Sequence, residues 1–536
     1  MPFSLKAFSV IFIFCGCSML ILLGPYSTRD PPQHSYGLAP INLQHKSEYE
    51  LRQEQLHQTP QRPDRLPAKT QSPQQQTDGL SRNNTADLED ELCYGKRVFI
   101  HDLPGSFNSD LLHLCRYGLT GWLNFCPHIA NDGFGEPLQA QVQVSAVNGS
   151  FFRDSIMEGN VSILEDSSKS VAVSSSSPFL GSGWYRTDPY MLEVVFHRRL
   201  LRYACLTKDP EMADAFFLPY YTGIDALRFL YGSGASKPKE RHGSELVKWL
   251  KQDAIAKKAW QKFDGRDHFL VMGRTAWDFD GSADGGWGTG ILHIPEYESM
   301  TILLIEREPW SVNQHAIPYP TSFHPSSASE LDGWIRKVRS VARPTLFTFV
   351  GSLRPELMKN GIREALIDQC SSSKNCQLLD CKRLRCSHNP QPIIETFLHS
   401  QFCLQPRGDT ATRRSLFDSI ISGCIPVLFH NDTAYSQYKW HLPAEAHQWS
   451  VYMYEEKIRG GARLEDALLQ YTQETIDAMR NALIDMIPRT VYAGFSSEEE
   501  IHEDAVDVTV GEVLKIVSKK KRKWPTPPGS NSTDIH

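Results

Sequence analysis

The chain has 536 residues, a formal net charge of −6, 40% hydrophobic residues and 22% charged residues. A chain of this length can bury the cores of two domains. Its weak negative charge gives no basic field of the kind that nucleic-acid-binding proteins use. The composition therefore predicts a multidomain globular protein and argues against nucleic acid as a partner.

The first feature along the chain is an uncharged, mostly apolar segment at residues 7–28. A helix of this length spans about 33 Å, which is enough for a bilayer core. Lys6 precedes the segment, whereas Arg29 and Asp30 largely cancel behind it, and this favours a cytoplasmic tail of residues 1–6. The alternative is a cleaved signal peptide, but no Ala-x-Ala-like site follows the apolar stretch. We therefore expect a transmembrane signal anchor.

A polar segment follows the anchor. Residues 25–90 contain ten Gln, repeated Pro and few large apolar side chains. Such a composition cannot bury enough apolar surface to offset the entropy of ordering. We expect residues 29–92 to be a disordered stem.

Asn-x-Ser/Thr sequons recur behind the anchor. They become acceptors for N-linked sugar when the chain lies in the secretory lumen. We expect glycosylation at these positions, which are Asn83, Asn148, Asn160, Asn431 and Asn531.

Ten of the 12 cysteines follow the anchor. An even number fits disulfides in an oxidising compartment, and the four between Cys370 and Cys386 predict a stapled loop. The absence of any Cys-x-x-Cys pair from the sequence argues against zinc. The ten are Cys93, Cys115, Cys126, Cys205, Cys370, Cys376, Cys381, Cys386, Cys403 and Cys424.

The first half of the globular region alternates short apolar stretches with helical spacing. Such alternation predicts a parallel sheet that is covered on both faces. The expected strands are 98–100, 214–219, 268–272 and 301–305, and the expected helices are 190–204 and 245–263.

The second half repeats the pattern after a boundary that we place near residue 330. It has expected strands at 345–350 and 402–404 and an expected helix at 392–400. The sequence thus predicts two α/β domains, at residues 93–330 and 331–515. The remaining residues, 516–536, contain the basic sequence Ser518–Lys523 and predict a flexible, solvated tail with at most weak contact to an acidic polysaccharide.

Residues 402–429 read as a turn, a helix and a buried strand. The residue types from Pro406 to Thr410 favour a turn, and Asp409 or Thr410 can cap the helix that follows. The apolar helical face consists of Leu416, Phe417, Ile420 and Ile421, and Gly423 suits the helix C-terminus before the strand Ile425–Phe429.

The same turn has the chemistry of an anion site. Free backbone N–H groups at a helix start, with Arg407, Arg413 and Arg414 nearby, suit a phosphate or diphosphate. Asp418 lies two turns into the helix, where a carboxylate can accept hydrogen bonds from a ribose. The alternative is an ordinary α/β unit with solvated arginines.

This stretch resembles the exostosin-type glycosyltransferases of family 47. The resemblance continues in order over roughly residues 93–515, and Gly183–Asp188 and Trp277–Phe279 place it nearest the plant xyloglucan galactosyltransferase branch. The other similar segments are Arg97–Pro104, Thr187–Tyr190, Ala213–Tyr220, Gly265–Val271, Ile317–Pro325 and Leu346–Arg354.

The resemblance implies a GT-B architecture, which consists of two Rossmann-like α/β domains facing across a cleft. It implies an inverting enzyme that moves galactose from UDP-galactose to xylosyl side chains of xyloglucan, with no obligatory cofactor. Anchor, stem and globular region match the type II layout of a Golgi membrane enzyme with a luminal catalytic region. Complexes with other wall glycosyltransferases are a further expectation.

Three alternatives remain open. UDP-galacturonic acid or UDP-arabinose can replace UDP-galactose, and another wall polysaccharide can be the acceptor. A non-catalytic GT-B shell that binds polysaccharide is a second class of protein. A nuclear or RNA-binding protein, suggested by the basic tail, is contradicted by the anchor and the sequons.

The resemblance also implies donor-binding residues in the second domain. We expect the diphosphate at Arg407, Gly408, Asp409 and Arg413, and we expect Asp418 to bind the ribose. Arg354 and Arg363 match exostosin segments and join the same anion site.

An inverting transferase needs a base for the acceptor hydroxyl. We rank Asp102 first because it follows the first expected strand, and in α/β sheets ligands bind at the carboxyl ends of strands. Asp188 and His268 are the next candidates, with His101 and Asp267 as neighbours of the same kind.

Asp278-Phe-Asp280 has the Asp-x-Asp form with which GT-A enzymes hold Mn²⁺. The surrounding chain shows no other GT-A resemblance, and the arginines already supply positive charge. We therefore interpret Asp278 and Asp280 as structural and predict no metal.

Overall fold

The computed structural model describes residues 91–138, 180–231, 239, 241–281, 287–352, 361–384, 386, 389–494 and 503–524. The expected anchor and stem, Arg354 and the sequons at Asn83, Asn148, Asn160 and Asn531 lie outside these residues. Within these ranges, no helix has both the length and the apolar character needed to cross a membrane.

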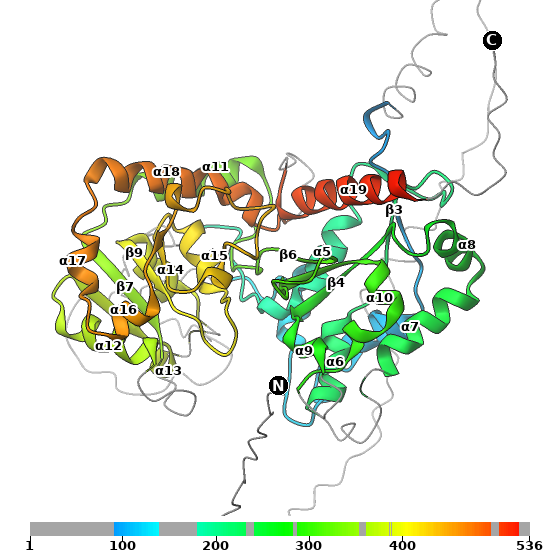
Figure 1. Cartoon of the computed structure of the whole chain (residues 1–536), viewed down its shortest axis with the longest axis horizontal. Helices are drawn as coiled ribbons and strands as arrows, with labels where there is room; N and C mark the ends of the chain where they lie inside the picture. Colours follow the sequence, from blue (N-terminus) through cyan, green and yellow to red (C-terminus); the bar gives the residue numbers. More distant parts are fainter. Residues whose placement is uncertain are drawn as a thin grey trace, which may run out of the picture. The chain divides into compact units, whose positions relative to one another are not determined.

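The first sheet has six parallel strands in the order β2-β1-β3-β4-β5-β6 (Figure 1). Its strands are β1 (Val98–Ile100), β2 (Leu206–Thr207), β3 (Ala215–Phe217), β4 (His268–Thr275), β5 (Thr301–Glu306) and β6 (Gln314–Ala316).

Both faces of this sheet are buried, as expected for a parallel sheet. Alternate residues of β4 belong to different cores: Phe269 and Val271 to one, and Leu270 and Met272 to the other. The first core contains Phe196 of α5 (Leu192–Leu200), and the second contains Trp260 of α8 (Ala254–Phe263).

The remaining helices of this part cover the sheet and its edges. They are α3 (Ser109–His113), α4 (Cys126–Ile129), α6 (Thr222–Leu230), α7 (Arg241–Gln252), α9 (Trp277–Asp280) and α10 (Pro295–Ser299), whereas α11 (Ala328–Ser340) packs on the second sheet. Short 3-10 turns lie at η1 (Gly105–Phe107), η2 (Asn131–Gly133), η3 (Pro189–Met191) and η5 (Ile291–His293).

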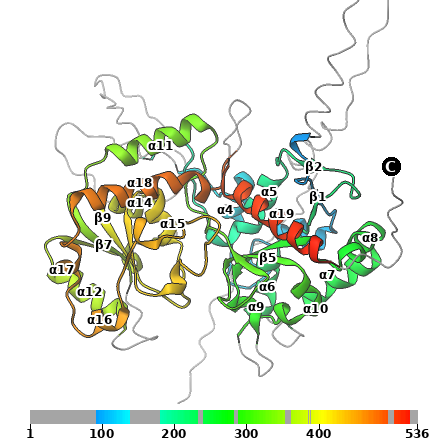
Figure 2. The same cartoon turned by 45° about the horizontal axis from the view of Figure 1, so that its top comes forward.

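The second sheet has five parallel strands in the order β11-β10-β9-β7-β8. These are β7 (Thr345–Gly351), β8 (Cys376–Asp380), β9 (Ser400–Gln405), β10 (Ile425–Leu428) and β11 (Val451–Tyr452). Figures 1 and 2 show α11 and α18 (Gln473–Thr490) on one side of this sheet and α12 (Ile362–Ser372) and α16 (Glu455–Arg459) on the other.

The other elements of the second half are short, apart from the last helix. They are α13 (Cys381–Leu384), α14 (Gln391–Leu398), α15 (Ser415–Ile421), η6 (Asn431–Thr433), η7 (Ala446–Gln448), α17 (Leu464–Leu468) and α19 (Ala505–Lys523).

The structure confirms the two parallel-sheet α/β domains of the expected fold class, and the strand order refines that expectation. In each sheet the first strand lies between the second and the third, and the fourth lies beyond the third. This is the doubly wound 2-1-3-4-5 order of flavodoxin-like domains rather than the 3-2-1-4-5-6 order of Rossmann domains. Both orders place the switch of direction beside the first strand.

The predicted elements hold with two local corrections. The expected helix 245–263 is two helices, because Asp253 ends α7 and caps α8 through its side chain. The helix that we expected after Asp409 begins only at Ser415, and no side chain caps it. Its apolar face is as predicted, since Leu416, Phe417, Ile420 and Ile421 are all fully buried.

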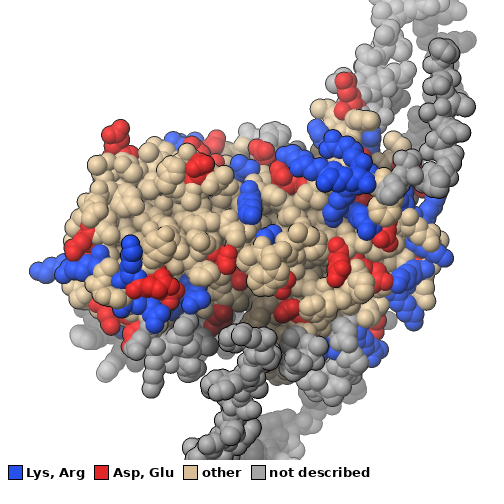
Figure 3. All heavy atoms as spheres, in the orientation of Figure 1, with Lys and Arg blue, Asp and Glu red and all other residues tan. Residues whose placement is uncertain are grey.

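The expected flexible tail is wrong for residues 516–523, because they belong to α19. This helix returns to the first sheet, where it packs against α5 and β3. At its start Arg199 donates to Asp504 Oδ2 at 3.0 Å, and near its end Lys521 Nζ donates to the Asp214 carbonyl at 2.7 Å. Figure 3 shows lysine and arginine side chains gathered around the end of this helix.

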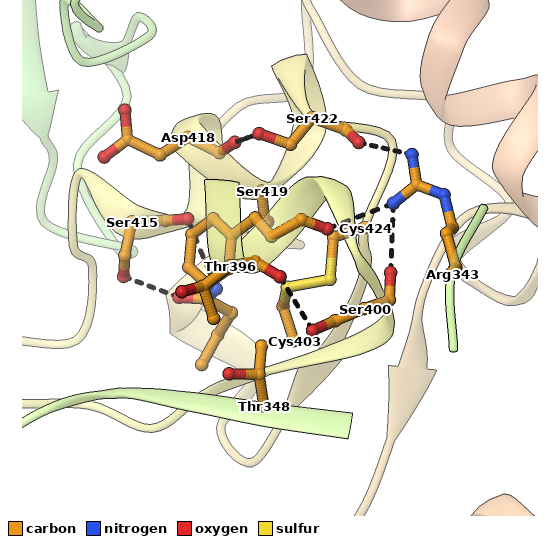
Figure 4. The surroundings of a disulfide bond; sticks show 12 residues. Arg343, Thr348, Thr396, Ser400, Cys403, Ser415, Asp418, Ser419, Ser422 and Cys424 are labelled. Atoms are coloured by element: carbon orange, nitrogen blue, oxygen red, sulfur yellow. Dashed lines mark hydrogen bonds between the residues drawn. A yellow bond between two sulfur atoms is a disulfide. The ribbon is translucent and has the colours of Figure 1, made fainter. Parts of the chain in front are cut away.

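All ten cysteines behind the expected anchor form disulfides, which confirms that expectation. The pairs are Cys93–Cys205, Cys115–Cys126, Cys370–Cys376, Cys381–Cys386 and Cys403–Cys424. The expected stapled loop therefore has two bridges between near neighbours. Figure 4 shows the buried Cys403–Cys424 bridge beneath α15, where Arg343 donates to the carbonyls of Ser400 and Ser422.

Candidate functional site

The second sheet changes direction between β7 and β9, and this is where ligands bind in doubly wound sheets. Ser352 follows β7, and the loop 406–414 follows β9. The two ends of that loop are tied together, because Ser415 Oγ donates to Gln405 Oε1 at 2.6 Å and Gln405 Nε2 donates to the Ser415 carbonyl at 3.2 Å.

Arg363, in the first turn of α12, bridges this switch point. Its Nε donates to the Arg407 carbonyl at 3.0 Å, and its Nη1 donates to the Ser352 carbonyl at 3.5 Å. Arg407 itself lies 3.4 Å from Glu455 Oε2 and keeps 38% of its side chain exposed. Two of the predicted donor-binding arginines are thus neighbours, although 44 residues separate them.

Arg413 folds over Gly408, so closely that a Cβ at Gly408 would overlap its guanidinium. Arg413 Nη1 donates to Thr410 Oγ1 at 3.0 Å and to the Thr412 carbonyl at 2.6 Å. Its buried Nη2 has no hydrogen-bond acceptor in the described part of the chain and lies 3.8 Å from the exposed Asp409. The structure therefore brings Arg363, Arg407, Gly408, Asp409 and Arg413 together.

The backbone N–H groups before α15 are not all free, which corrects the expected anion site. Glu306, the last residue of β5, accepts from the N–H groups of Ala411 at 3.3 Å and Thr412 at 2.9 Å. It also accepts from Thr412 Oγ1 at 2.6 Å, and that hydroxyl lies 3.2 Å from the Tyr319 hydroxyl. A carboxylate of the first sheet thus occupies donors that we expected to meet a diphosphate.

Asp418 is not available to a ribose, which corrects the second expectation at this helix. It is 4% exposed and lies 3.4 Å from Arg414 Nε. Burial raises the pKa of the Asp418 carboxyl, and the charge of Arg414 opposes that rise. The guanidinium of Arg414 also donates to the Thr187 carbonyl and to Ser322 Oγ, both at 2.6 Å. The Asp418 carboxylate, which we expected to bind the ribose, therefore forms a buried ion pair with Arg414.

The candidate bases have different surroundings. Asp102 is exposed just after β1, beside the switch point between β1 and β3 of the first sheet. Asp188 is half-buried, and its Oδ1 accepts from the Tyr190 N–H at 2.8 Å. Burial raises the pKa of Tyr190, and both Asp188 and Arg413 lie near enough to act on that phenol. Both carboxylates remain candidates.

His268 is wrong for a base, because it lies at the amino end of β4 with none of its surface exposed. Its Nε2 is 3.2 Å from His101 Nε2, and its Nδ1 is 2.9 Å from Asp267 Oδ1. The ring stacks on Phe216 at 4.8 Å. Burial, with the neighbouring His268, lowers the pKa of His101 to about 3. His101, His268 and Asp267 therefore form a buried chain of polar contacts on one face of the first sheet.

Asp278 and Asp280 both have protein partners. Asp278 Oδ2 accepts from Arg274 Nε and its Oδ1 from Trp287 Nε1, each at 2.8 Å. Asp280 Oδ1 lies 2.9 Å from His293 Nε2. No cluster of three or more potential metal-ligating side chains occurs among residues that the structure describes. Asp278 therefore forms a buried ion pair with Arg274.

Sequence reasoning missed several residues that organise the site, namely Glu306, Arg274, Tyr319 and Glu455. Glu306 directly ends a strand that was predicted, so the strand-end rule that selected Asp102 also applies to it. Glu455 begins a short helix far along the chain, and no local pattern connects it with Arg407.

Of the sequons, Asn431 lies within the described residues, at the exposed start of η6 after β10. Its glycosylation stays a prediction.

The Exostosin GT47 domain matches residues 92–468. The chain is 38% identical over 443 residues to the xyloglucan galactosyltransferase MUR3 of Arabidopsis thaliana, covering 82% of this chain and 65% of that protein. It is 36% identical over 437 residues to the xyloglucan galactosyltransferase XLT2 of the same plant, covering 81% and 77%. It is also 36% identical over 430 residues to that plant's xyloglucan-specific galacturonosyltransferase 1, covering 80% and 58%. The chain belongs to the exostosin GT47 family of glycosyltransferases.

Proposed function

We propose that this protein transfers galactose from UDP-galactose, with inversion, to xylosyl side chains of xyloglucan. The two α/β domains would work as a GT-B enzyme, with the donor on the second sheet and the acceptor on the first. No obligatory metal or cofactor is part of this proposal.

One observation carries the proposal of a donor site. Three arginines surround the switch point of the second sheet: Arg363 bonded to the Arg407 carbonyl, Arg407 beside Glu455, and Arg413 over Gly408. Guanidinium groups at this place suit the anionic diphosphate of the donor and the further negative charge that it gains as UDP leaves. The partly exposed Arg407, and the Nη2 of Arg413, which has no hydrogen-bond acceptor among the described residues, leave donors for it.

The sugar and the acceptor rest on the relatives. Two of them are named xyloglucan galactosyltransferases, and the third is named for galacturonosyl transfer to the same polysaccharide. Galactose is therefore the proposed sugar, with galacturonic acid as the rival donor. The arginine set argues against a non-catalytic polysaccharide-binding shell, because such a shell has no use for a diphosphate site.

For location we propose a Golgi membrane protein of type II topology with a luminal catalytic region. The uncharged segment 7–28 supports an anchor, and five disulfides fit an oxidising lumen. Complexes with other wall glycosyltransferases are part of the same proposal.

The test is transfer by the full-length protein in detergent. Xyloglucan oligosaccharide is incubated with UDP-galactose, UDP-galacturonic acid or UDP-arabinose, and the product mass is measured. We expect a galactosyl product with UDP-galactose. Binding of UDP without transfer from any donor would contradict the proposed reaction, and absence of UDP binding would contradict the donor site.

A further inference from the structure

Four aromatic side chains form a continuous row on the first domain, outside the site described above. Trp122 meets Tyr231 with ring centroids 5.6 Å apart, Tyr231 meets Trp287 at 5.3 Å, and Trp287 stacks on Trp277 at 5.5 Å. Trp122, Tyr231 and Trp277 expose 61%, 41% and 50% of their surface. We call these four side chains the aromatic row.

The exposed end of the row is held rigidly. Trp122 lies within the 11-residue separation of the Cys115–Cys126 disulfide. Inside it Arg116 pairs with Asn124 in an antiparallel bridge, and the Tyr117 N–H donates to the Leu123 carbonyl at 3.0 Å. A stapled hairpin presents a large apolar ring at low cost in conformational entropy.

The other end of the row connects with the candidate site. Trp287 Nε1 donates to Asp278, and Asp278 also accepts from Arg274, which lies near the end of β4. The guanidinium of Arg274 lies over the Tyr190 ring at 4.3 Å. Tyr190 is the phenol on which Asp188 and Arg413 both act. Direct contacts thus lead from the aromatic row to Tyr190, where burial raises the pKa of the phenol and the charges of Arg274 and Arg413 oppose that rise.

We propose that the aromatic row binds the glucan chain of the polysaccharide acceptor and directs it toward the donor arginines. This inference rests on the proposed function and adds the acceptor subsite to it. A pyranose ring has an apolar C–H face that packs on an aromatic ring, as other apolar groups do. Exposed rings in series therefore suit a polymer of neutral sugars, whose hydroxyl edges stay in water.

Two features favour a neutral sugar chain over an acidic one or a protein. The four side chains of the row are neutral, and an acidic polymer would need cationic partners along its length. The rings come from separate segments and contact one another in edge-on and stacked pairs, an arrangement of single ring faces in series that suits the successive rings of a sugar chain.

The experiment compares Trp122→Ala, Trp277→Ala and the double variant with wild type, all as full-length protein in detergent. Trp310→Ala is the matched control, since Trp310 is 77% exposed and lies outside the row. Native electrophoresis through gels that contain xyloglucan measures glucan binding without any donor. Kinetics then give KM for xyloglucan and KM for UDP-galactose.

We expect each single variant to weaken xyloglucan retention and raise the xyloglucan KM about three- to tenfold, and the double variant to do so more strongly. KM for UDP-galactose should stay as in wild type, Trp310→Ala should have no effect, and Trp122→Phe should recover most of the binding. If the wild type binds xyloglucan but transfers no galactose, the proposed function is overturned, while the aromatic row stands as a glucan-binding site.

Three results would overturn the row as a glucan site. The first is retention of the double variant by xyloglucan equal to that of wild type. The second is equal retention of wild type by gels of polygalacturonate, an acidic polymer. The third is a loss of self-association of the double variant in light scattering with unchanged xyloglucan retention, which would make the row a protein interface.

Discussion

The two sheets share one strand order but differ in the side chains at their carboxyl ends. The second sheet carries arginines at its switch point, Arg363 and Arg407, with Arg413 in the same loop. The first sheet carries carboxylates, Asp102 after β1 and Glu306 at the end of β5. We call these side chains the cationic edge and the acidic edge, although Arg274 of β4 and Arg307 after β5 also lie at the ends of strands in the first sheet.

This difference suits the two substrates of a sugar transfer. The donor is an anion that gains charge as it leaves, whereas the acceptor is a neutral alcohol that must lose a proton. Glu306 and Arg414 each reach across to the other half of the chain, to Thr412 and to the Thr187 carbonyl respectively. The predictions below test this division, from the largest expected effect to the smallest.

The largest effect is expected at Asp102, on the acidic edge. Asp102→Asn keeps the shape of the side chain but cannot accept a proton, so turnover should fall roughly 10²–10⁴-fold. UDP affinity, measured by calorimetry, should stay unchanged because the donor is held by the other domain. Asp188→Asn is the matched comparison: if it abolishes turnover while Asp102→Asn survives, Asp188 is the base.

The next effect concerns the buried ion pair that Arg414, at the start of α15, forms with Asp418 in the same helix. Arg414→Ala leaves the buried Asp418 carboxylate without its partner, so the free energy of unfolding should fall by about 3–5 kcal/mol. Urea unfolding measures this. Arg339→Ala is the control, because its pair with Asp485 is exposed and should contribute only about 0–1 kcal/mol. Equal losses of unfolding free energy in the two variants would show that burial does not determine how much each ion pair contributes to stability.

A smaller effect is expected on the cationic edge. Arg407→Ala should weaken UDP binding by about 1.5–3 kcal/mol, because it removes a charge-assisted contact to the diphosphate. Arg407 and Arg459 both lie close to Glu455. Arg459→Ala is therefore the control, because it removes a cation from Glu455 and leaves Arg407 in place. A folded Arg407→Ala protein with wild-type UDP affinity would leave the loop with a structural role alone.

The smallest effect is expected from removal of metal. If the arginines stabilise the leaving diphosphate, EDTA should leave most of the transferase activity intact. Galactose incorporation is measured with and without the chelator. Complete loss that Mn²⁺ restores would instead assign a metal role to Asp278 or Asp280 and remove the contrast between the two edges.

Local patterns in the sequence predicted most of the strands and helices. The stretch 345–350 became β7, and the stretch 425–429 became β10, because short stretches rich in apolar and β-branched residues suit the buried strands of a parallel sheet. The helical spacing of Leu416, Phe417, Ile420 and Ile421 likewise identified the buried face of α15. These signals repeat over two to four residues, so they can be read without a fold.

The arginine cluster was predicted in part. The turn at 406–414 was found because its residue types are local to one another. That the turn's N–H groups are bonded to Glu306 could not be predicted. The spacing of Arg414 and Asp418 on one helix allows their ion pair, but the burial of that pair could not be predicted. Arg414 reaches the Thr187 carbonyl across 227 residues, and no spacing rule extends so far.

The sequence by itself determined the fold class, the family, the even set of cysteines and the place of the arginine turn. The tertiary structure alone decided the strand order, the disulfide partners, the buried role of His268 and the alignment of Trp122 with Tyr231, Trp287 and Trp277. The physical reason is that periodicity and turn chemistry act between near neighbours in the chain. Burial, ion pairing and ring contacts depend on which distant segments the folded topology brings together.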